Sequence, residues 1–83
     1  MYYIYAIYNT DAHKVYIGQT ENLEERLRLH NNKEFRNSYT SRFDGKWFLI
    51  YTEAVPNRAD ALQREKQLKS YRGREFIKKF KPE

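Results

Sequence analysis

The segment from Tyr2 to Tyr8 limits the fold of this 83-residue chain most strongly, because every one of its positions is apolar or aromatic. In a β-strand, alternate side chains point to opposite sides, and both sets are hydrophobic here. One set is Tyr3, Tyr5 and Ile7, and the other is Tyr2, Ile4, Ala6 and Tyr8. The pattern predicts the central strand of a sheet, covered on both sides.

The residues that follow this strand predict a hairpin and a helix. Asn9–His13 is rich in turn-forming residues, and Lys14–Gly18 resumes a β pattern, so the first two strands are expected to pair in an antiparallel hairpin. Either Thr20 or Asn22 can cap a helix that runs to about Asn32.

The second half of the chain predicts a third strand and two more helices. A polar loop extends to Gly45, and aromatic and β-branched residues then predict a strand at Lys46–Glu53. Asn57 is a suitable cap for a helix at Arg58–Ser70, and Gly73 separates that helix from a last short one. The last helix carries an apolar stripe of Phe76, Ile77 and Phe80. The order β-β-α-β-α-α predicts an α+β fold, a small three-stranded antiparallel sheet flanked by helices, in one domain that spans residues 1–83.

Composition excludes several classes of protein. The chain has no cysteine, which rules out disulfide bonds, cysteine-based zinc sites and thiol nucleophiles. It has no apolar run of membrane-spanning length and no signal-peptide pattern, so we expect a soluble cytoplasmic protein without a membrane partner. Lys and Arg number 16 against 11 Asp and Glu, and this excess indicates either a polyanionic partner or a solvated basic helix. Most of it lies near the C-terminal end, at Lys66, Lys69, Arg72, Arg74, Lys78, Lys79 and Lys81.

Two polar residues lie on the apolar side of the first predicted helix. At about 100° per residue, Arg26 and His30 fall in the same arc as Leu23 and Leu27. In a structural interpretation, the aliphatic part of Arg26 covers the rim of the core and His30 is a hydrogen-bonded boundary residue. In a functional interpretation, they are a cation and a titratable base that face the sheet.

Glu65 is the corresponding residue of the second helix, because it lies in an apolar arc with Ala61, Leu62 and Leu68. Burial of an unpaired carboxylate is costly, so this residue is expected either to be paired or to bind a cation. One interpretation is an internal ion pair with a residue such as Arg26, and the other is a metal site.

If both helices pack on the same face of the sheet, these polar residues meet the strand tyrosines at one site. The set is Tyr5, Tyr16, Arg26, His30 and Glu65. It suits phosphodiester hydrolysis, which needs a base for the water, positive charge for the transition state and a Lewis acid for the leaving oxygen. A tyrosine or the histidine can supply the base, the arginine the charge, and a divalent ion on the glutamate the Lewis acid.

The same residues resemble the signature of the GIY-YIG nucleases. The tripeptide YIY at residues 3–5 is similar to the first family motif with Tyr in place of the leading Gly, and YIG at residues 16–18 matches the second. Arg26 and His30 stand where the helix of the family carries its arginine and histidine, and Glu65 corresponds to its metal-binding glutamate. The resemblance covers nearly the whole chain. It is closest to small free-standing bacterial members and extends to the N-terminal incision domain of the bacterial excision-repair nuclease.

The resemblance implies a metal-dependent DNA endonuclease with a one-metal mechanism, in DNA repair or recombination, that uses one Mg²⁺ or Mn²⁺ ion. In that reading Tyr5 or His30 deprotonates the water, and Tyr16 positions the water or the phosphate. Arg26 stabilises the transition state, and Glu65 holds the ion. Contacts to duplex or branched DNA are expected from Lys14, Gly18, Lys69, Arg72 and Arg74, and a protein partner or a homodimer is expected to supply specificity.

Two other functions compete with this one. In a non-catalytic nucleic-acid-binding module, sheet tyrosines would stack on bases and the basic C-terminal segment would follow the phosphates. In a protein-interaction domain, the aromatic surface would serve protein contacts, but that reading explains neither Arg26 nor Glu65.

Overall fold

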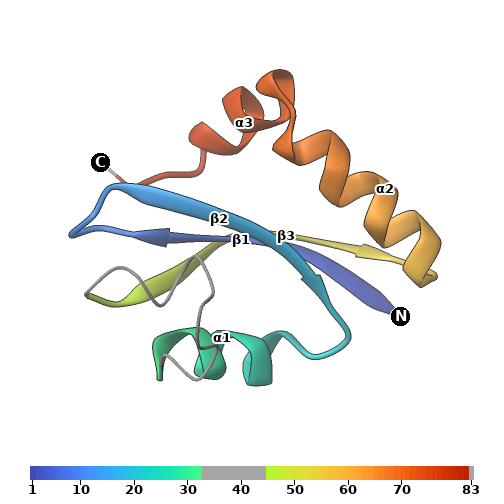
Figure 1. Ribbon diagram of the computed structural model, residues 1–83, viewed down its shortest axis with the longest axis horizontal. Coiled ribbons are helices and arrows are strands. Elements are labelled where there is room, and N and C mark those ends of the chain that lie inside the picture. Colours follow the sequence, from blue (N-terminus) through green and yellow to red (C-terminus); the bar gives the residue numbers. More distant parts are fainter. Residues whose placement is uncertain (33–44, 83) are drawn as a thin grey trace.

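Helices cover both faces of an antiparallel sheet in the computed structural model, which describes residues 1–32 and 45–82 (Figure 1). The three strands are β1 (Tyr2–Asn9), β2 (Lys14–Thr20) and β3 (Trp47–Val55), in the order β2-β1-β3. The helices are α1 (Leu23–Asn31), α2 (Arg58–Lys69) and α3 (Tyr71–Lys78). The predicted fold class, the order of elements and the central place of the first strand are all confirmed.

The two apolar sides of β1 belong to two separate cores. On one side, Tyr5 and Ile7 are buried with Trp47, and Leu23 and Leu27 of α1 pack against them. On the other side, the strand is covered by residues of α2 and α3. This second core contains Ile4, Ala6, Ile17, Ala61, Leu68 and Ile77.

The helices that carry Arg26 and Glu65 therefore lie on opposite faces of the sheet. Figure 1 shows α1 on one side and α2 with α3 on the other. The premise that both helices share one face is wrong. Any site that uses residues from both helices must extend around the free side of β2, the strand at that edge of the described sheet.

Several predicted boundaries shift by a few residues. The second strand continues past Gly18 to Thr20, because its last residue still pairs with Tyr3 of β1. Ser70, rather than Gly73, separates the last two helices: its backbone is extended and its side chain accepts a hydrogen bond from the Gly73 amide. A β-carbon at Gly73 would collide with the backbone of α2, so glycine lets the two helices meet at a sharp angle.

A β-bulge divides β3 into two parts that face different cores. Ala6 pairs with Tyr51 and Ile7 pairs with Leu49, which leaves Ile50 as an extra residue. Before the bulge, the ring of Trp47 is buried on the α1 side. After it, Tyr51 packs on the α2 side.

Polar contacts fasten each part of β3 to its helix. At the start of the strand, the Asn31 amide of α1 donates to the Trp47 carbonyl at 3.1 Å and accepts from the Trp47 amide at 2.7 Å. Near its end, Arg64 of α2 makes a forked contact to the Glu53 carboxylate, at 2.7 and 3.2 Å. The Tyr51 hydroxyl donates to the same carboxylate at 2.8 Å.

Within the described ranges, no helix has the length and apolar character needed to cross a membrane.

Candidate active site

Three ring side chains from three elements meet on the α1 side of the sheet. Tyr5 of β1 and His30 of α1 are each only 2% exposed, and the tyrosine hydroxyl lies 2.9 Å from His30 Nε2. The ring of Tyr16, on β2, lies over both, with centroids 6.2 Å from Tyr5 and 5.0 Å from His30. The amphipathic pattern of α1 brings His30 here, as predicted, because Leu23 and Leu27 hold the same helix face against the sheet.

Gly18 makes room for the hydroxyl of Tyr5. The two residues are directly paired across β1 and β2. A β-carbon on Gly18 would come within 2.7 Å of the Tyr5 hydroxyl oxygen and 3.1 Å of the Tyr16 ring. The absence of a side chain on β2 therefore lets the Tyr5 ring lie across the edge strand. The glycine of the YIG tripeptide has a packing role at this site.

The protonation of this pair is set mainly by burial. Burial raises the pKa of Tyr5, the neighbouring Tyr16 and Glu65 raise that pKa further, and the positive charge of Arg26 opposes the rise. Burial, followed by Arg26, lowers the pKa of His30 from 6.5 to about 4. At neutral pH, Tyr5 is a phenol and His30 a neutral imidazole. With its proton on Nδ1, the imidazole accepts the hydrogen bond of the phenol at Nε2.

The stability of this protein is therefore expected to fall at a higher pH during acidification than titration of its carboxylates alone would cause. His30 has the lower pKa in the folded state, so its contribution is complete above pH 6.5 and is lost as the pH falls toward 4. The loss amounts to at most about 3 kcal/mol. The pKa values of Glu25 and Glu53 are lowered from 4.5, so their contribution to stability is lost mainly below pH 4.5. Urea denaturation from pH 7 to 5 measures the slope, which His30→Gln should flatten. An equal slope in the variant would contradict this assignment.

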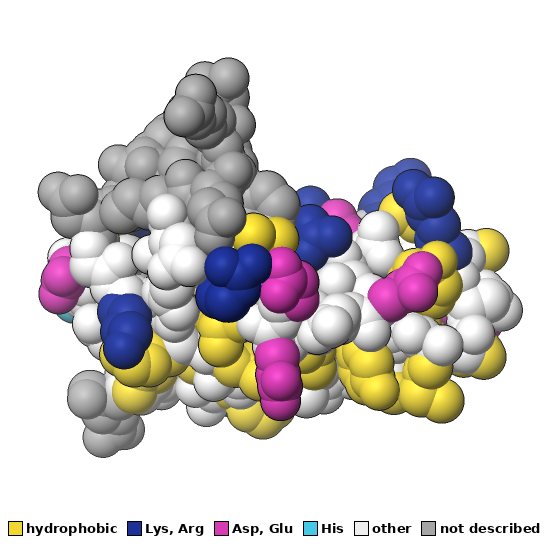
Figure 2. All heavy atoms as spheres, turned by 90° about the horizontal axis from the view of Figure 1, so that it is seen from below, with side chains coloured by type: hydrophobic (Ala, Val, Ile, Leu, Met, Phe, Trp, Pro, Cys, Tyr) yellow, Lys and Arg dark blue, Asp and Glu magenta, His cyan; other side chains and the backbone are white. Residues whose placement is uncertain are grey.

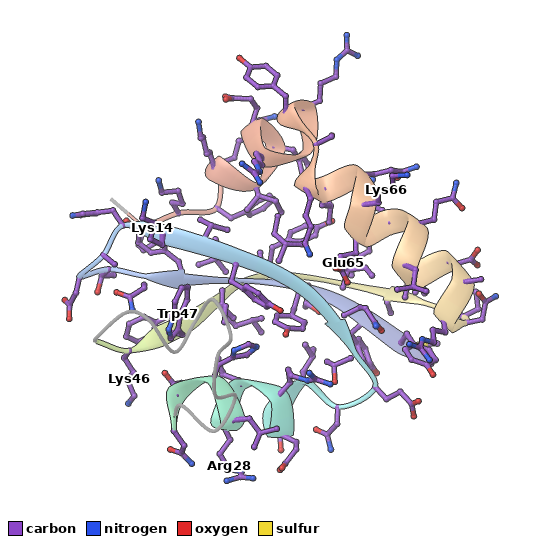
Figure 3. The ribbon with its side chains drawn as sticks, viewed as in Figure 1. Lys14, Arg28, Lys46, Trp47, Glu65 and Lys66 are labelled. Atoms are coloured by element: carbon purple, nitrogen blue, oxygen red, sulfur yellow. The ribbon has the colours of Figure 1, made fainter. Side chains whose placement is uncertain are left out.

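Charges from both helices act on the Tyr5 hydroxyl. Arg26 lines a hollow of about 400 Å³ beside α1 together with Gln19 and Arg58, so solvent reaches it. Glu65 projects from α2 toward the sheet, whereas Lys66 points away from it (Figure 3). The structure thus brings Tyr5, Tyr16 and His30 together, while Arg26 and Glu65 act on the Tyr5 hydroxyl from helices on opposite faces of the sheet.

The partner of Glu65 differs from the one proposed from the sequence. Its carboxylate lies 2.7 Å from Lys69 Nζ, one turn along α2, and the Glu65 side chain is 21% exposed. A pair with Arg26 is therefore not formed. The predicted apolar arc is also corrected, because Leu62 is 48% exposed while Ala61 and Leu68 are buried. Glu65 follows Ala61 by four positions and so lies at the margin of the buried stripe.

The donor set near Glu65 suits a cation that keeps most of its water. Among the described residues, no group of three or more His, Cys, Asp or Glu side chains gathers to enclose a metal ion. The Glu65 side chain is only 21% exposed, and its carboxylate is a hard-oxygen ligand. Mg²⁺ commonly binds through one or two carboxylates and retains several waters, so this residue fits such an ion.

A basic groove of about 640 Å³ runs between β2 and the helices α2 and α3. Among the described residues that line it, every charged side chain is a cation, and Tyr16 also lines it. The cations are Lys14, Lys69, Arg74, Lys78 and Lys81, joined by His13. Figure 3 shows Lys14, one of these lining residues, at the start of β2. By contrast, the α1 side of the molecule carries acidic and basic side chains intermixed (Figure 2).

Three of the five residues predicted to bind nucleic acid line this groove, namely Lys14, Lys69 and Arg74. The other two do not: Arg72 is exposed on α3 outside the lining, and Gly18 is buried beneath Tyr5. Sequence reasoning did not select Lys78 for the groove. Its spacing of four residues from Arg74 was the available signal, because such residues share one face of a helix.

Similarity to a known family and to a solved structure extends over nearly the whole chain. A model of the GIY-YIG catalytic domain matches residues 1–81. The fold is similar to the solution NMR structure of the UPF0213 protein BH0048 from Bacillus halodurans, with 27% sequence identity and a TM-score of 0.54. That similarity covers 98% of this chain and 86% of the other. No curated protein matches the sequence significantly.

Proposed function

Because the chain belongs to the GIY-YIG family of nucleases, we propose that it is a divalent-metal-dependent endonuclease that hydrolyses phosphodiester bonds in DNA. The observation that carries the proposal is the contact between the Tyr5 hydroxyl and His30, on which charges from Arg26 and Glu65 also act. A phenol held against a neutral imidazole, and acted on by a cation and a carboxylate, is suited to moving a proton beside a phosphate.

Tyr5 and His30 act in this proposal as one base. The Nε2 atom of His30 contacts the Tyr5 hydroxyl, so a proton that leaves Tyr5 can pass directly to His30. Tyr5 accepts the proton of the attacking water as its own proton passes to His30. This order of transfers avoids a free phenolate, which the raised pKa of Tyr5 disfavours.

The remaining residues orient the phosphate and balance its charge. Arg26 offers guanidinium donors to the developing negative charge, and Tyr16 positions the water or a phosphate oxygen from the adjacent strand. Glu65 would hold a single Mg²⁺ or Mn²⁺, which supplies Lewis acidity toward the leaving oxygen when bound. We place this activity in DNA repair or recombination, with a protein partner or a second copy supplying specificity.

The basic groove is the proposed binding surface for the DNA backbone. Five cations and no carboxylate stand among the described residues of its lining, which is the electrostatic pattern that phosphate contacts require. Tyr16 lines the groove and also contacts Tyr5 and His30, so a strand that follows the groove passes beside the catalytic residues. Binding of this kind is non-specific in sequence.

Burial of the central tyrosines weakens the case for a non-catalytic module. Tyr5 and Tyr8 are 2% and 5% exposed, and helices cover both faces of the sheet. Bases cannot stack on rings that are covered in this way.

A cleavage assay on linear, nicked, branched and single-stranded DNA tests the proposal. We expect cleavage in Mg²⁺ or Mn²⁺ and none in excess chelator, with DNA still bound in the chelator because the groove needs no metal. Binding without cleavage of any substrate in either metal would support the non-catalytic module instead. Cleavage that persists in chelator would exclude a metal-dependent mechanism.

A further inference from the structure

Lys69 belongs to both of the proposed functional regions. It lines the basic groove, and its Nζ lies 2.7 Å from the Glu65 carboxylate. The other groove lysine with a recorded ion pair, Lys78, contacts Glu75 of its own helix at 3.1 Å. Of these two pairs, only Lys69–Glu65 joins the groove to the candidate active site.

We propose that Lys69 couples the two regions: its ammonium group occupies the Glu65 carboxylate until a DNA phosphate in the groove draws it away. The inference rests on the proposed function, because it assumes that Glu65 receives a divalent cation. The ammonium group and the cation are both positive and compete for the same carboxylate oxygens. A phosphate in the groove is negatively charged, as the Glu65 carboxylate is, so it offers the ammonium group a second acceptor.

The geometry allows this exchange. The Lys69 side chain is 46% exposed, so its flexible stem can turn toward the groove, whereas Glu65 is 21% exposed and held closer to the sheet. The ion pair spans one helical turn, and pairs of this kind are weak enough to exchange with another anion. The carboxylate would therefore be neutralised in the free protein and become available when DNA is bound.

Coupling of this kind is reciprocal, so it can be measured from either side. If phosphate binding releases Glu65 for the cation, then removal of the Glu65 charge must release Lys69 for phosphate. The second half of this statement requires no metal at all. It can be tested in chelator, where no cleavage interferes.

The first experiment titrates Mn²⁺ alone into the protein by calorimetry. Lys69→Gln should bind Mn²⁺ about three-fold more tightly than wild type, because a cation next to the ligand has been removed. Lys66→Gln also removes one positive charge, from the residue next to Glu65, but the Lys66 side chain points away from the sheet. Its affinity for Mn²⁺ should match that of wild type within about two-fold. Equal affinity of Lys69→Gln and wild type would overturn the coupling and leave the metal site standing. An absence of Mn²⁺ binding in every variant would overturn both.

The second experiment measures the affinity for a fluorescein-labelled duplex in chelator. Glu65→Gln should tighten binding about two- to three-fold at low salt, and this gain should vanish when Lys69→Gln is already present. Glu24→Gln, which removes an exposed carboxylate from α1, corrects for the change in net charge. A gain from Glu65→Gln that is equal in both backgrounds would overturn the proposal, because it would show that Lys69 is not the residue released.

Discussion

Replacement of Tyr5 by Phe is expected to lower the rate of metal-dependent cleavage by about 10²- to 10⁴-fold, as loss of general acid–base catalysis does. The ring would still fill the space above Gly18, and only the hydroxyl that contacts His30 would be lost. DNA affinity should stay within a few-fold of wild type, because Tyr5 does not line the groove. Single-turnover cleavage and a binding assay in chelator measure the two effects separately.

Tyr8→Phe is the matched control for this variant. Tyr8 lies on the same strand and is 5% exposed, and its hydroxyl also contacts a histidine, His13, at 3.1 Å. Tyr5→Phe should lose about 1 to 3 kcal/mol of stability because its partner His30 is buried, and Tyr8→Phe should lose about 0.5 to 1.5 kcal/mol because His13 is exposed to water. Only Tyr5→Phe should lose catalysis. Parallel losses of rate in both variants would identify Tyr5 as a fold residue rather than a catalytic one.

Glu65→Gln is expected to abolish metal-dependent cleavage while leaving the fold nearly as stable as wild type. The carboxylate contacts a half-exposed lysine on its own helix, and loss of such a pair costs less than about 1 kcal/mol. A buried pair with Arg26 would have cost about 3 to 5 kcal/mol. Denaturation in chelator, cleavage in Mn²⁺ and Mn²⁺ calorimetry together measure the result. A variant that still cuts DNA at the wild-type rate would remove Glu65 from the active site.

Glu53→Gln provides the control for charge loss at a structural carboxylate. Glu53 accepts hydrogen bonds from both Arg64 and Tyr51, so its replacement should destabilise the contact between β3 and α2. Cleavage per folded molecule should be retained at a temperature well below the unfolding midpoint. This result would assign Glu53 to stability and Glu65 to catalysis.

The sequence predicted the order of elements and much of the site for identifiable physical reasons. The first strand has apolar side chains on both of its sides, and this pattern predicted the central position that β1 has. Asn22 and Asn57 each accept a hydrogen bond from the backbone three residues later, as good helix caps do. The helical period placed His30 toward the sheet because two leucines share its face.

The face on which each helix packs could not be predicted in this way. An apolar stripe requires that a helix pack against something, but β1 offers two equally apolar faces, so the pattern of α1 and α2 fits either one. The partner of Glu65 was missed for a related reason. Because α2 lies on the face opposite α1, Glu65 and Arg26 come from different sides of the sheet, and the Glu65 carboxylate pairs with Lys69, one turn along its own helix.

The bulge in β3 constrains the number of residues in that strand. Trp47 and Tyr51 are both odd-numbered, so a regular strand would point them to the same side; the extra residue sends them to opposite cores. Removal of one residue there would force a choice between the Trp47 core and the Arg64 contact to Glu53. We therefore expect that an odd-numbered insertion or deletion inside this strand is not tolerated, because it would turn one of the two parts away from its core.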